Sequence, residues 1–186
     1  QARGSRGQKN GCSALLRREG RRHESAPRQG KAPGKDRIGH RPLYEEIRFM
    51  KEIGKIISFQ NTHHSKGFHT KVEDFKDVPF DIKRTYWTYD IPAGAARGGH
   101  AHKECLEVII AASGSFTVIL DDGTRKEAFH LNRPDQGLLV NTGIWRTLED
   151  FSAGSVCFVL ASELYDADDY IYEYEDFLEY TKNGQS

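Results

Sequence analysis

The chain has 186 residues, and its 27 Lys and Arg side chains balance its 27 Asp and Glu side chains, so the formal net charge is zero. This balance excludes a protein that binds nucleic acid through its net charge, and no apolar run reaches the roughly 18 residues that cross a bilayer. The three cysteines are far apart and fit neither a zinc site nor a disulfide framework. We therefore expect a cytoplasmic protein with neither a nucleic-acid nor a membrane partner.

The charge is unevenly distributed, because residues 1–49 carry 13 basic and only 5 acidic side chains. This leader has few large apolar residues, so it cannot bury enough surface to offset chain entropy, and we predict that it is disordered. Met50, the only methionine, directly precedes the patterned sequence. We interpret Met50 as the true start of a domain over residues 50–186. A native disordered tail, the remnant of a preceding domain and a tail that binds nucleic-acid phosphates are the alternatives.

The patterned region reads as short strands separated by turns. The predicted strands cover residues 55–59, 84–91, 106–112, 115–121, 125–131, 136–140, 144–149 and 155–161. Strands at this spacing, with Gly-rich turns, indicate an all-β sandwich or barrel rather than alternating strands and helices. Alternation along residues 84–91 places Arg84 and Tyr86 on the same face, which we predict to look into the barrel.

The end of the chain has a helical pattern instead. Apolar side chains fall on one face of a helix, with acidic side chains opposite, at Tyr170, Ile171, Tyr174, Phe177 and Leu178. Asp168 and Asp169 would then lie at the helix N-terminus, where the helix dipole favours acidic side chains. We predict a short C-terminal helix that covers the β-core.

The stretch GAARGGHAHKECLEVIIAASG, residues 94–114, holds the strongest candidate for chemistry. His100 and His102 are two residues apart, so on a strand both imidazoles point to one face, about 6.6 Å apart along the strand. Histidine is the side chain best suited to donate and accept protons near neutral pH. The spacing therefore predicts an acid–base pair.

The same stretch resembles the first sequence motif of the cupin superfamily in the spacing of Gly94, His100, His102, Glu107 and Gly114. In metal-binding cupins the two histidines and the glutamate are ligands, and a third histidine comes from a second motif. The matching stretch here, NTGIWRTL, has Arg146 at that position. A permanent cation at a ligand position argues against a divalent metal, although two histidines and a carboxylate can hold iron facially. We predict that no metal is bound.

Longer strings narrow the resemblance: FDIKRTYWTYDIPAGAARGGHAHK, GSFTVILDDG, GLLVNTGIWRTLEDFS and VLASELYDADDYIYEYEDF. Together, over residues 53–181, they resemble the WxcM-like nucleotide-sugar 3,4-ketoisomerases, metal-free cupin-fold enzymes that act on dTDP-4-keto-6-deoxyglucose in deoxyamino-sugar and polysaccharide biosynthesis. The resemblance implies a single-domain cupin barrel of jelly-roll type, no cofactor, and a dTDP-sugar substrate. It also implies a homodimer with exchanged N-terminal strands, for which KIISF and FHTKV are candidates.

The resemblance further implies roles for individual residues. His102 would be the base at C3 of the sugar and His100 the acid at C4. Tyr86 would hydrogen-bond the sugar or a histidine, with a barrel-filling aromatic side chain as the alternative. Glu107 would orient a histidine. The cations that would contact the diphosphate or the enediolate are Arg84, Arg97 and Arg146.

Two other functions fit the same pattern. A metal-dependent cupin enzyme, either a dioxygenase or a sugar isomerase, would contain stoichiometric metal in its active form. A non-catalytic cupin that binds sugar nucleotides would have no activity to lose when His100 or His102 is replaced.

Overall fold

The computed structural model describes residues 52–184. The predicted disorder of residues 1–49 and the interpretation of Met50 as a start lie outside this part of the chain. Within residues 52–184, no helix combines the length and the apolar character needed to span a membrane.

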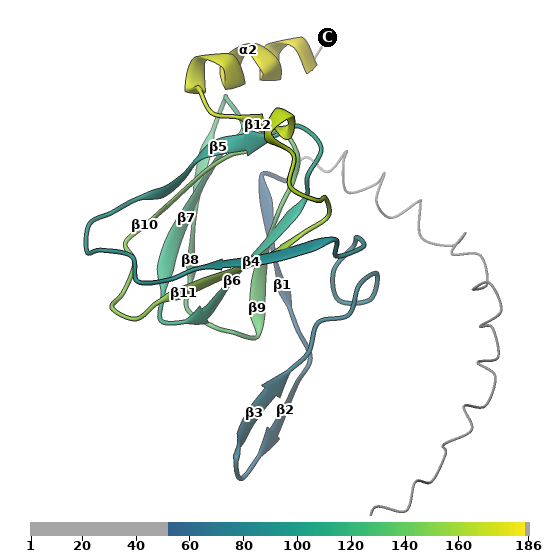
Figure 1. Ribbon diagram of the computed structural model, residues 1–186, viewed down its shortest axis with the longest axis vertical. Coiled ribbons are helices and arrows are strands. Elements are labelled where there is room, and N and C mark those ends of the chain that lie inside the picture. The colour runs from purple at the N-terminus through teal and green to yellow at the C-terminus, as the bar shows by residue number, and fades with distance from the viewer. Residues whose placement is uncertain (1–51, 185–186) are drawn as a thin grey trace, which may run out of the picture. The chain divides into compact units, whose positions relative to one another are not determined.

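Two five-stranded antiparallel sheets face each other and form the barrel (Figure 1). One sheet has the strand order β1-β9-β6-β11-β4 and the other β12-β5-β10-β7-β8. The bounds are β1 Gly54–Ser58, β2 Asn61–His64, β3 Gly67–Thr70, β4 Arg84–Thr88, β5 Arg97–His102, β6 Glu107–Ser113, β7 Phe116–Asp121, β8 Lys126–Leu131, β9 Gln136–Val140, β10 Trp145–Glu149, β11 Val156–Ala161 and β12 Tyr170–Ile171. A 3₁₀ turn, η1 (Ala167–Asp169), and helix α2 (Tyr174–Gly184) complete the set. This confirms the predicted all-β architecture with one short C-terminal helix.

The apolar core fills the space between the two sheets. Side chains from both sheets, such as Ile109 of β6, Val118 of β7 and Leu138 of β9, are buried in one cluster. Strand alternation extends the same inward face to polar residues, because Glu107 lies two positions before Ile109. The interior therefore changes from apolar to polar along the strands, and the polar part contains the predicted site.

A close contact between β5 and β10 fixes how the histidine strand sits in the barrel. A Cβ atom on Gly98 would lie 2.6 Å from the backbone oxygen of Arg146, and Gly98 has a positive φ of 79°. Only glycine tolerates both the contact and this backbone conformation. The register of β10 shifts between Arg146 and Thr147, and Arg146 then lies opposite His100. The glycine thus helps to place an arginine beside the first histidine.

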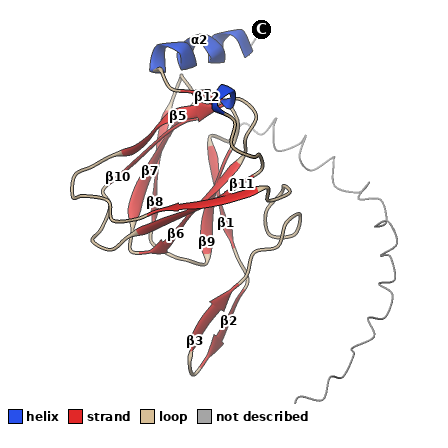
Figure 2. Cartoon of the chain, in the orientation of Figure 1, coloured by secondary structure: helices blue, strands red, loops and turns tan. Residues whose placement is uncertain are grey.

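Helix α2 covers one end of the barrel beside β12 and β5, as predicted (Figure 2). Phe177 is buried there against Ala101 and Ile171. The Tyr174 hydroxyl donates a 2.6 Å hydrogen bond to the Asp121 carboxylate at the end of β7. Apolar burial and one hydrogen bond to a buried charge together hold the helix in place.

The predicted start of this helix is wrong. Helix α2 begins at Tyr174, whereas Asp169 ends the 3₁₀ turn η1. Tyr170 and Ile171 form strand β12 and pair with His102 and Ala101 of β5. Pairing with β5 outweighs the helical periodicity of these residues, because tertiary hydrogen bonds override a local pattern.

Candidate active site

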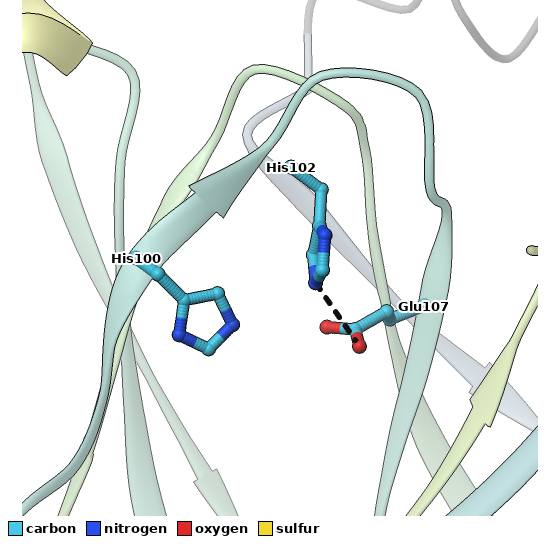
Figure 3. Close-up of side chains that lie close together, drawn as sticks. All are labelled: His100, His102 and Glu107. Atoms are coloured by element: carbon cyan, nitrogen blue, oxygen red, sulfur yellow. Dashed lines mark ion pairs between the residues drawn. The ribbon is translucent and has the colours of Figure 1, made fainter. Parts of the chain in front are cut away.

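Strands from both sheets bring the predicted polar side chains together inside the barrel. His100 and His102 come from β5, and Figure 3 shows both rings pointing toward Glu107 of β6. Tyr86 of β4 and Arg146 of β10 complete the cluster. All five residues are predicted from the sequence, three of them from the first motif, but only the folded barrel shows that they lie together.

The two histidines form the predicted pair. Their ring centroids lie 5.1 Å apart with an interplanar angle of 83°, so one ring presents its edge to the other. His102 has no exposed surface, and its Nε2 atom lies 3.4 Å from Glu107 Oε1. The spacing of two residues on a strand therefore placed both rings on one inward face, as expected.

Glu107 is the centre of the charge network. Its Oε2 atom lies 3.3 Å from Arg146 Nη1, and both side chains are 1% exposed. Its Oε1 atom accepts a 2.6 Å hydrogen bond from the Tyr86 hydroxyl. The sequence predicts that Tyr86 binds the sugar or a histidine; in the structure its hydroxyl binds this carboxylate, and the contact with the sugar stays a prediction. A buried carboxylate needs such partners, because an isolated buried charge is very costly.

The network keeps Glu107 ionised and Tyr86 neutral. Burial alone would raise the pKa of the Glu107 carboxyl, but the Arg146 charge and the hydrogen bond from Tyr86 lower it well below its usual value. Burial and the adjacent Glu107 charge raise the pKa of the Tyr86 phenol far above its usual value. Tyr86 is therefore a hydrogen-bond donor here rather than an acid–base group.

The donor set also has the composition of a facial metal site. One ligand atom each of His100, His102 and Glu107 lies within 4.8 Å of the others. However, the Glu107 carboxylate already faces the buried, permanently charged Arg146. A divalent cation would have to share this carboxylate with a second positive charge at close range. The residues therefore do not fit a divalent metal, and we derive no chemical step through one.

His100 is neutral in the ligand-free site near neutral pH. Burial and then the Arg146 charge lower the pKa of its imidazole to about 4, against an opposing effect of Glu107. His100 therefore carries no acidic proton at rest, and it must gain one before it can act as the predicted acid at C4.

The effect of the Arg146 charge on the pKa of His100 can be tested directly by replacing Arg146. We expect Arg146→Met to raise the pKa of His100, because the repelling cation is removed and the negative Glu107 is left unopposed. Arg146→Lys retains the charge and is the matched control, with the pKa of His100 remaining low. A pH titration of the His100 ring by NMR measures both. An unchanged pKa in Arg146→Met would show that burial alone sets the value.

The two other predicted cations differ in position. Arg84 is partly buried on the same face of β4 as Tyr86, and its guanidinium carbon lies 5.3 Å from the Tyr86 ring centroid. Arg97 begins β5, opposite Leu148 of β10, and its side chain is exposed. The structure thus brings Arg84 and Arg146 to the site, whereas it leaves Arg97 at the surface.

Two residues at the site were not predicted to be there. Asp169 Oδ2 lies 2.7 Å from His102 Nδ1, and the Tyr170 ring centroid lies 4.2 Å from that of His102. Both belong to the string DDYI, which the helical interpretation placed at the start of the C-terminal helix. The pairing of β12 with β5 is what brings them to His102.

Several nitrogen atoms of the site lack a hydrogen-bond acceptor among residues 52–184. They are Arg84 Nε, the Nε2 atoms of His100 and His102, and the three guanidinium nitrogens of Arg146, whose contact with Glu107 is an ion pair without hydrogen-bond geometry. Buried polar groups are nearly always hydrogen-bonded, so a cluster of unsatisfied ones calls for a bound polar group. Two of these four side chains are arginines, which favours an anionic or oxygen-rich ligand.

Comparison with known proteins agrees with this geometry. Residues 52–182 match the protein family described as FdtA: WxcM-like, C-terminal. The chain belongs to the WxcM-like family. Its resemblance to this family at the level of sequence strings is therefore confirmed over nearly all of the described residues.

Individual WxcM-like relatives are similar over most of their length. The chain is 40% identical over 126 residues to TDP-4-oxo-6-deoxy-alpha-D-glucose-3,4-oxoisomerase of Aneurinibacillus thermoaerophilus, covering 68% of this chain and 91% of the relative. It is 42% identical to the WlaRB TDP-quinovose 3,4-ketoisomerase of Campylobacter jejuni, with a TM-score of 0.66 and coverage of 70% and 99%. It is 34% identical to the 3,4-ketoisomerase QdtA of Thermoanaerobacterium thermosaccharolyticum, with a TM-score of 0.70 and coverage of 72% and 97%.

The QdtA structure is a histidine-to-asparagine variant in complex with TDP-4-keto-6-deoxyglucose. A more distant likeness, to the RmlC epimerase of Mycobacterium tuberculosis at 17% identity and a TM-score of 0.56, concerns the fold alone. The WxcM-like chain therefore has the cupin fold that the first motif predicted.

Proposed function

We propose that the protein is a metal-independent 3,4-ketoisomerase that converts dTDP-4-keto-6-deoxyglucose to the 3-keto-6-deoxyhexose in deoxyamino-sugar and polysaccharide biosynthesis. The observation that carries this proposal is the pair of half-buried His100 and fully buried His102, beside arginine side chains with unsatisfied hydrogen-bond donors. An acid–base pair inside a cationic pocket suits proton transfer on an anionic sugar nucleotide. The family relatives described above act on, or bind, sugars of this class.

The reaction needs only proton movements. Removal of the C3 proton converts the C4 ketone into an enediolate, with the charge on the C4 oxygen. Loss of the O3 hydroxyl proton, protonation of the C4 oxygen and addition of a proton to C4 then give the C3 ketone and the C4 hydroxyl. No atom is gained or lost, so neither an oxidant nor a hydride carrier is required.

We assign His102 as the base at C3 and His100 as the acid at C4. His102 suits the role of base because a carboxylate on its Nδ1 side stabilises the imidazolium that forms when Nε2 takes a proton. His100 is neutral at rest, so we expect its pKa to rise in the complex, where the diphosphate and the enediolate oppose the field of Arg146. Arg146 and Arg84 would bind the anionic parts of the substrate, and Glu107 would hold Arg146 in place.

Arg97 remains a proposed contact of the substrate diphosphate. Its exposed side chain at the start of β5 lies outside the buried cluster. A long flexible phosphate-bearing ligand can reach from the barrel interior to such a surface residue, so this contact would involve the nucleotide rather than the sugar.

The proposal is tested by adding dTDP-4-keto-6-deoxyglucose to the full chain and following the sugar carbonyl by carbon NMR. We expect the carbonyl signal to move from C4 to C3. Protein treated with a strong chelator should turn over at the same rate, which separates this proposal from a metal-dependent cupin enzyme. Tight binding of the nucleotide without a new ketone would instead favour the non-catalytic binding protein.

We also infer that two copies form a dimer by exchanging N-terminal strands. The hairpin β2–β3 projects from the barrel, and its side chains are almost all exposed, with Phe68 at 74% (Figure 1). A two-stranded hairpin alone is marginally stable in water, so it gains from packing on a second copy. Sedimentation should give twice the mass of the 186-residue chain, and Phe68→Asp should shift the protein toward the monomer. A monomeric parent chain would contradict the inference.

A reducing, cytoplasmic setting is part of the same proposal. Cys105 and Cys157 are both free and buried. Burial also raises the pKa of the Cys157 thiol to about 12, so this group is unreactive.

A further inference from the structure

The Nδ1 atom of His102 is hydrogen-bonded to the carboxylate of Asp169. The imidazole has no exposed surface, and Nδ1 lies 2.7 Å from Oδ2 of Asp169, whose side chain is 11% exposed. This distance is short for a nitrogen–oxygen hydrogen bond, as expected when one partner is charged. Asp169 therefore contacts the histidine to which we assign the role of base, on the side of the ring that carries Nδ1.

Backbone hydrogen bonds around Asp169 and around the end of β5 fix the position of this carboxylate. Its second oxygen, Oδ1, accepts a 2.6 Å hydrogen bond from the backbone N–H of Glu104. The backbone oxygen of Asp169 accepts from the N–H of Lys103 at 2.9 Å. The next residue, Tyr170, pairs with His102 across β12 and β5. Three links thus join the Asp169 segment to the end of β5 and to the two residues that follow it.

The chemistry of the contact determines which ring nitrogen carries the proton. An ionised carboxylate only accepts hydrogen bonds, so Nδ1 of His102 must be the donor. In a neutral imidazole the other nitrogen, Nε2, then has a free lone pair. Nε2 is the atom that lies on the side of Glu107, inside the barrel.

We infer that Asp169 is a positioning residue that fixes His102 in the Nδ1–H tautomer, so that Nε2 faces the substrate as the proton-accepting atom. This inference rests on the proposed ketoisomerase function and extends it. Asp169 acts through His102 and does not itself contact the sugar. It also stabilises the positive charge that appears on the ring when Nε2 takes the C3 proton.

A metal site is the competing interpretation of the same residues. One ligand atom each of His102, Cys105 and Asp169 lies within 4.8 Å of the others. However, burial raises the pKa of the Cys105 thiol, and its sulfur already donates to the backbone oxygen of Leu106 at 3.4 Å. A protonated thiol is a poor metal ligand, so the contact with Asp169 is better explained as a hydrogen bond to histidine.

The test compares the full chain with the variant Asp169→Asn. The asparagine oxygen can still accept from the Glu104 N–H, which leaves its amide group facing Nδ1. An amide donor at that position favours the Nε2–H tautomer and blocks the base. We expect kcat to fall by roughly 10²-fold or more while KM changes by no more than about 2-fold. Asp168→Asn, the same change at an exposed neighbour in the same turn, should leave both constants unchanged.

Nitrogen NMR of the substrate-free protein gives a second readout. The His102 signals are identified by their absence from His102→Asn, and we expect the Nδ1–H tautomer in the parent chain and the Nε2–H tautomer in Asp169→Asn. An Nε2–H tautomer in the parent chain would overturn the inference, even if the variant failed to fold. A folded Asp169→Asn with unchanged kcat would do the same. Absence of turnover in the parent chain would count against the ketoisomerase function, which the tautomer does not test.

Discussion

His102→Asn is expected to abolish most turnover while leaving nucleotide binding intact. General acid–base catalysis by one group contributes roughly 10²–10⁴-fold, and asparagine cannot take up a proton near neutral pH. The asparagine can still donate to the Asp169 carboxylate, which replaces the contact of His102 Nδ1. We therefore expect kcat to fall by roughly 10²–10⁴-fold, with the affinity for TDP changed by no more than about 3-fold.

The matched control is His130→Asn. His130 lies on the exposed side of β8, outside the barrel interior, so the same substitution should leave kcat unchanged. Steady-state kinetics and calorimetric titration with TDP measure the two quantities on each protein. A His102→Asn variant that turns over normally would show that the chemistry lies elsewhere. Loss of TDP binding in parallel with kcat would show that His102 holds the ligand rather than the proton.

Glu107→Gln should be the most destabilising single substitution at the site. It leaves Arg146 buried without its anionic partner, although glutamine can still accept from the Tyr86 hydroxyl. Breaking a buried ion pair by removing one partner costs about 3–5 kcal/mol. We therefore expect the free energy of unfolding, measured with denaturant, to fall by about 3–5 kcal/mol.

Glu163→Gln provides the control for this loss. Glu163 makes an ion pair with Lys83 at 2.6 Å, but the two side chains are 37% and 41% exposed. A solvent-exposed pair contributes about 1 kcal/mol or less, so this variant should be nearly as stable as the parent chain. Equal losses in the two variants would contradict the view that the Glu107–Arg146 pair is a strongly coupled buried pair.

Much of the fold could be predicted because the patterns that specify its strands lie in short stretches of sequence. Alternation along residues 84–91 correctly placed Arg84 and Tyr86 on one inward face, and the spacing of His100 and His102 correctly gave a pair on one side of a strand. Both follow from the two-residue period of a strand, which depends on no distant part of the chain. The partners of these side chains come from other strands and carry no such local signal.

Arg146 illustrates this limit. A buried arginine needs an anion, and the sequence suggested the substrate as the source. The structure shows a protein carboxylate, Glu107, which is 39 positions away in the chain but adjacent across the barrel. The orphaned guanidinium nitrogens leave room for a substrate contact as well.

Asp169 shows how a local pattern can predict the wrong secondary structure. Two adjacent acidic residues before an amphipathic pattern predicted a helix N-terminus, which is a reasonable use of the helix dipole. In the structure its carboxylate contacts His102 and the Glu104 N–H, and the chain continues into β12. A local pattern carries no information on long-range hydrogen bonds to β5. The sequence therefore placed Asp169 on a solvated helix face rather than beside His102.

The central claim is that the site moves protons between C3 and C4 of a sugar nucleotide. The most direct measurement is to incubate the full chain with dTDP-4-keto-6-deoxyglucose in heavy water and follow the sugar by proton NMR. If the site transfers these protons, the C3 proton signal of the substrate disappears and a 3-ketone forms with deuterium at C4. Retention of the C3 proton, with no new ketone, would contradict the claim.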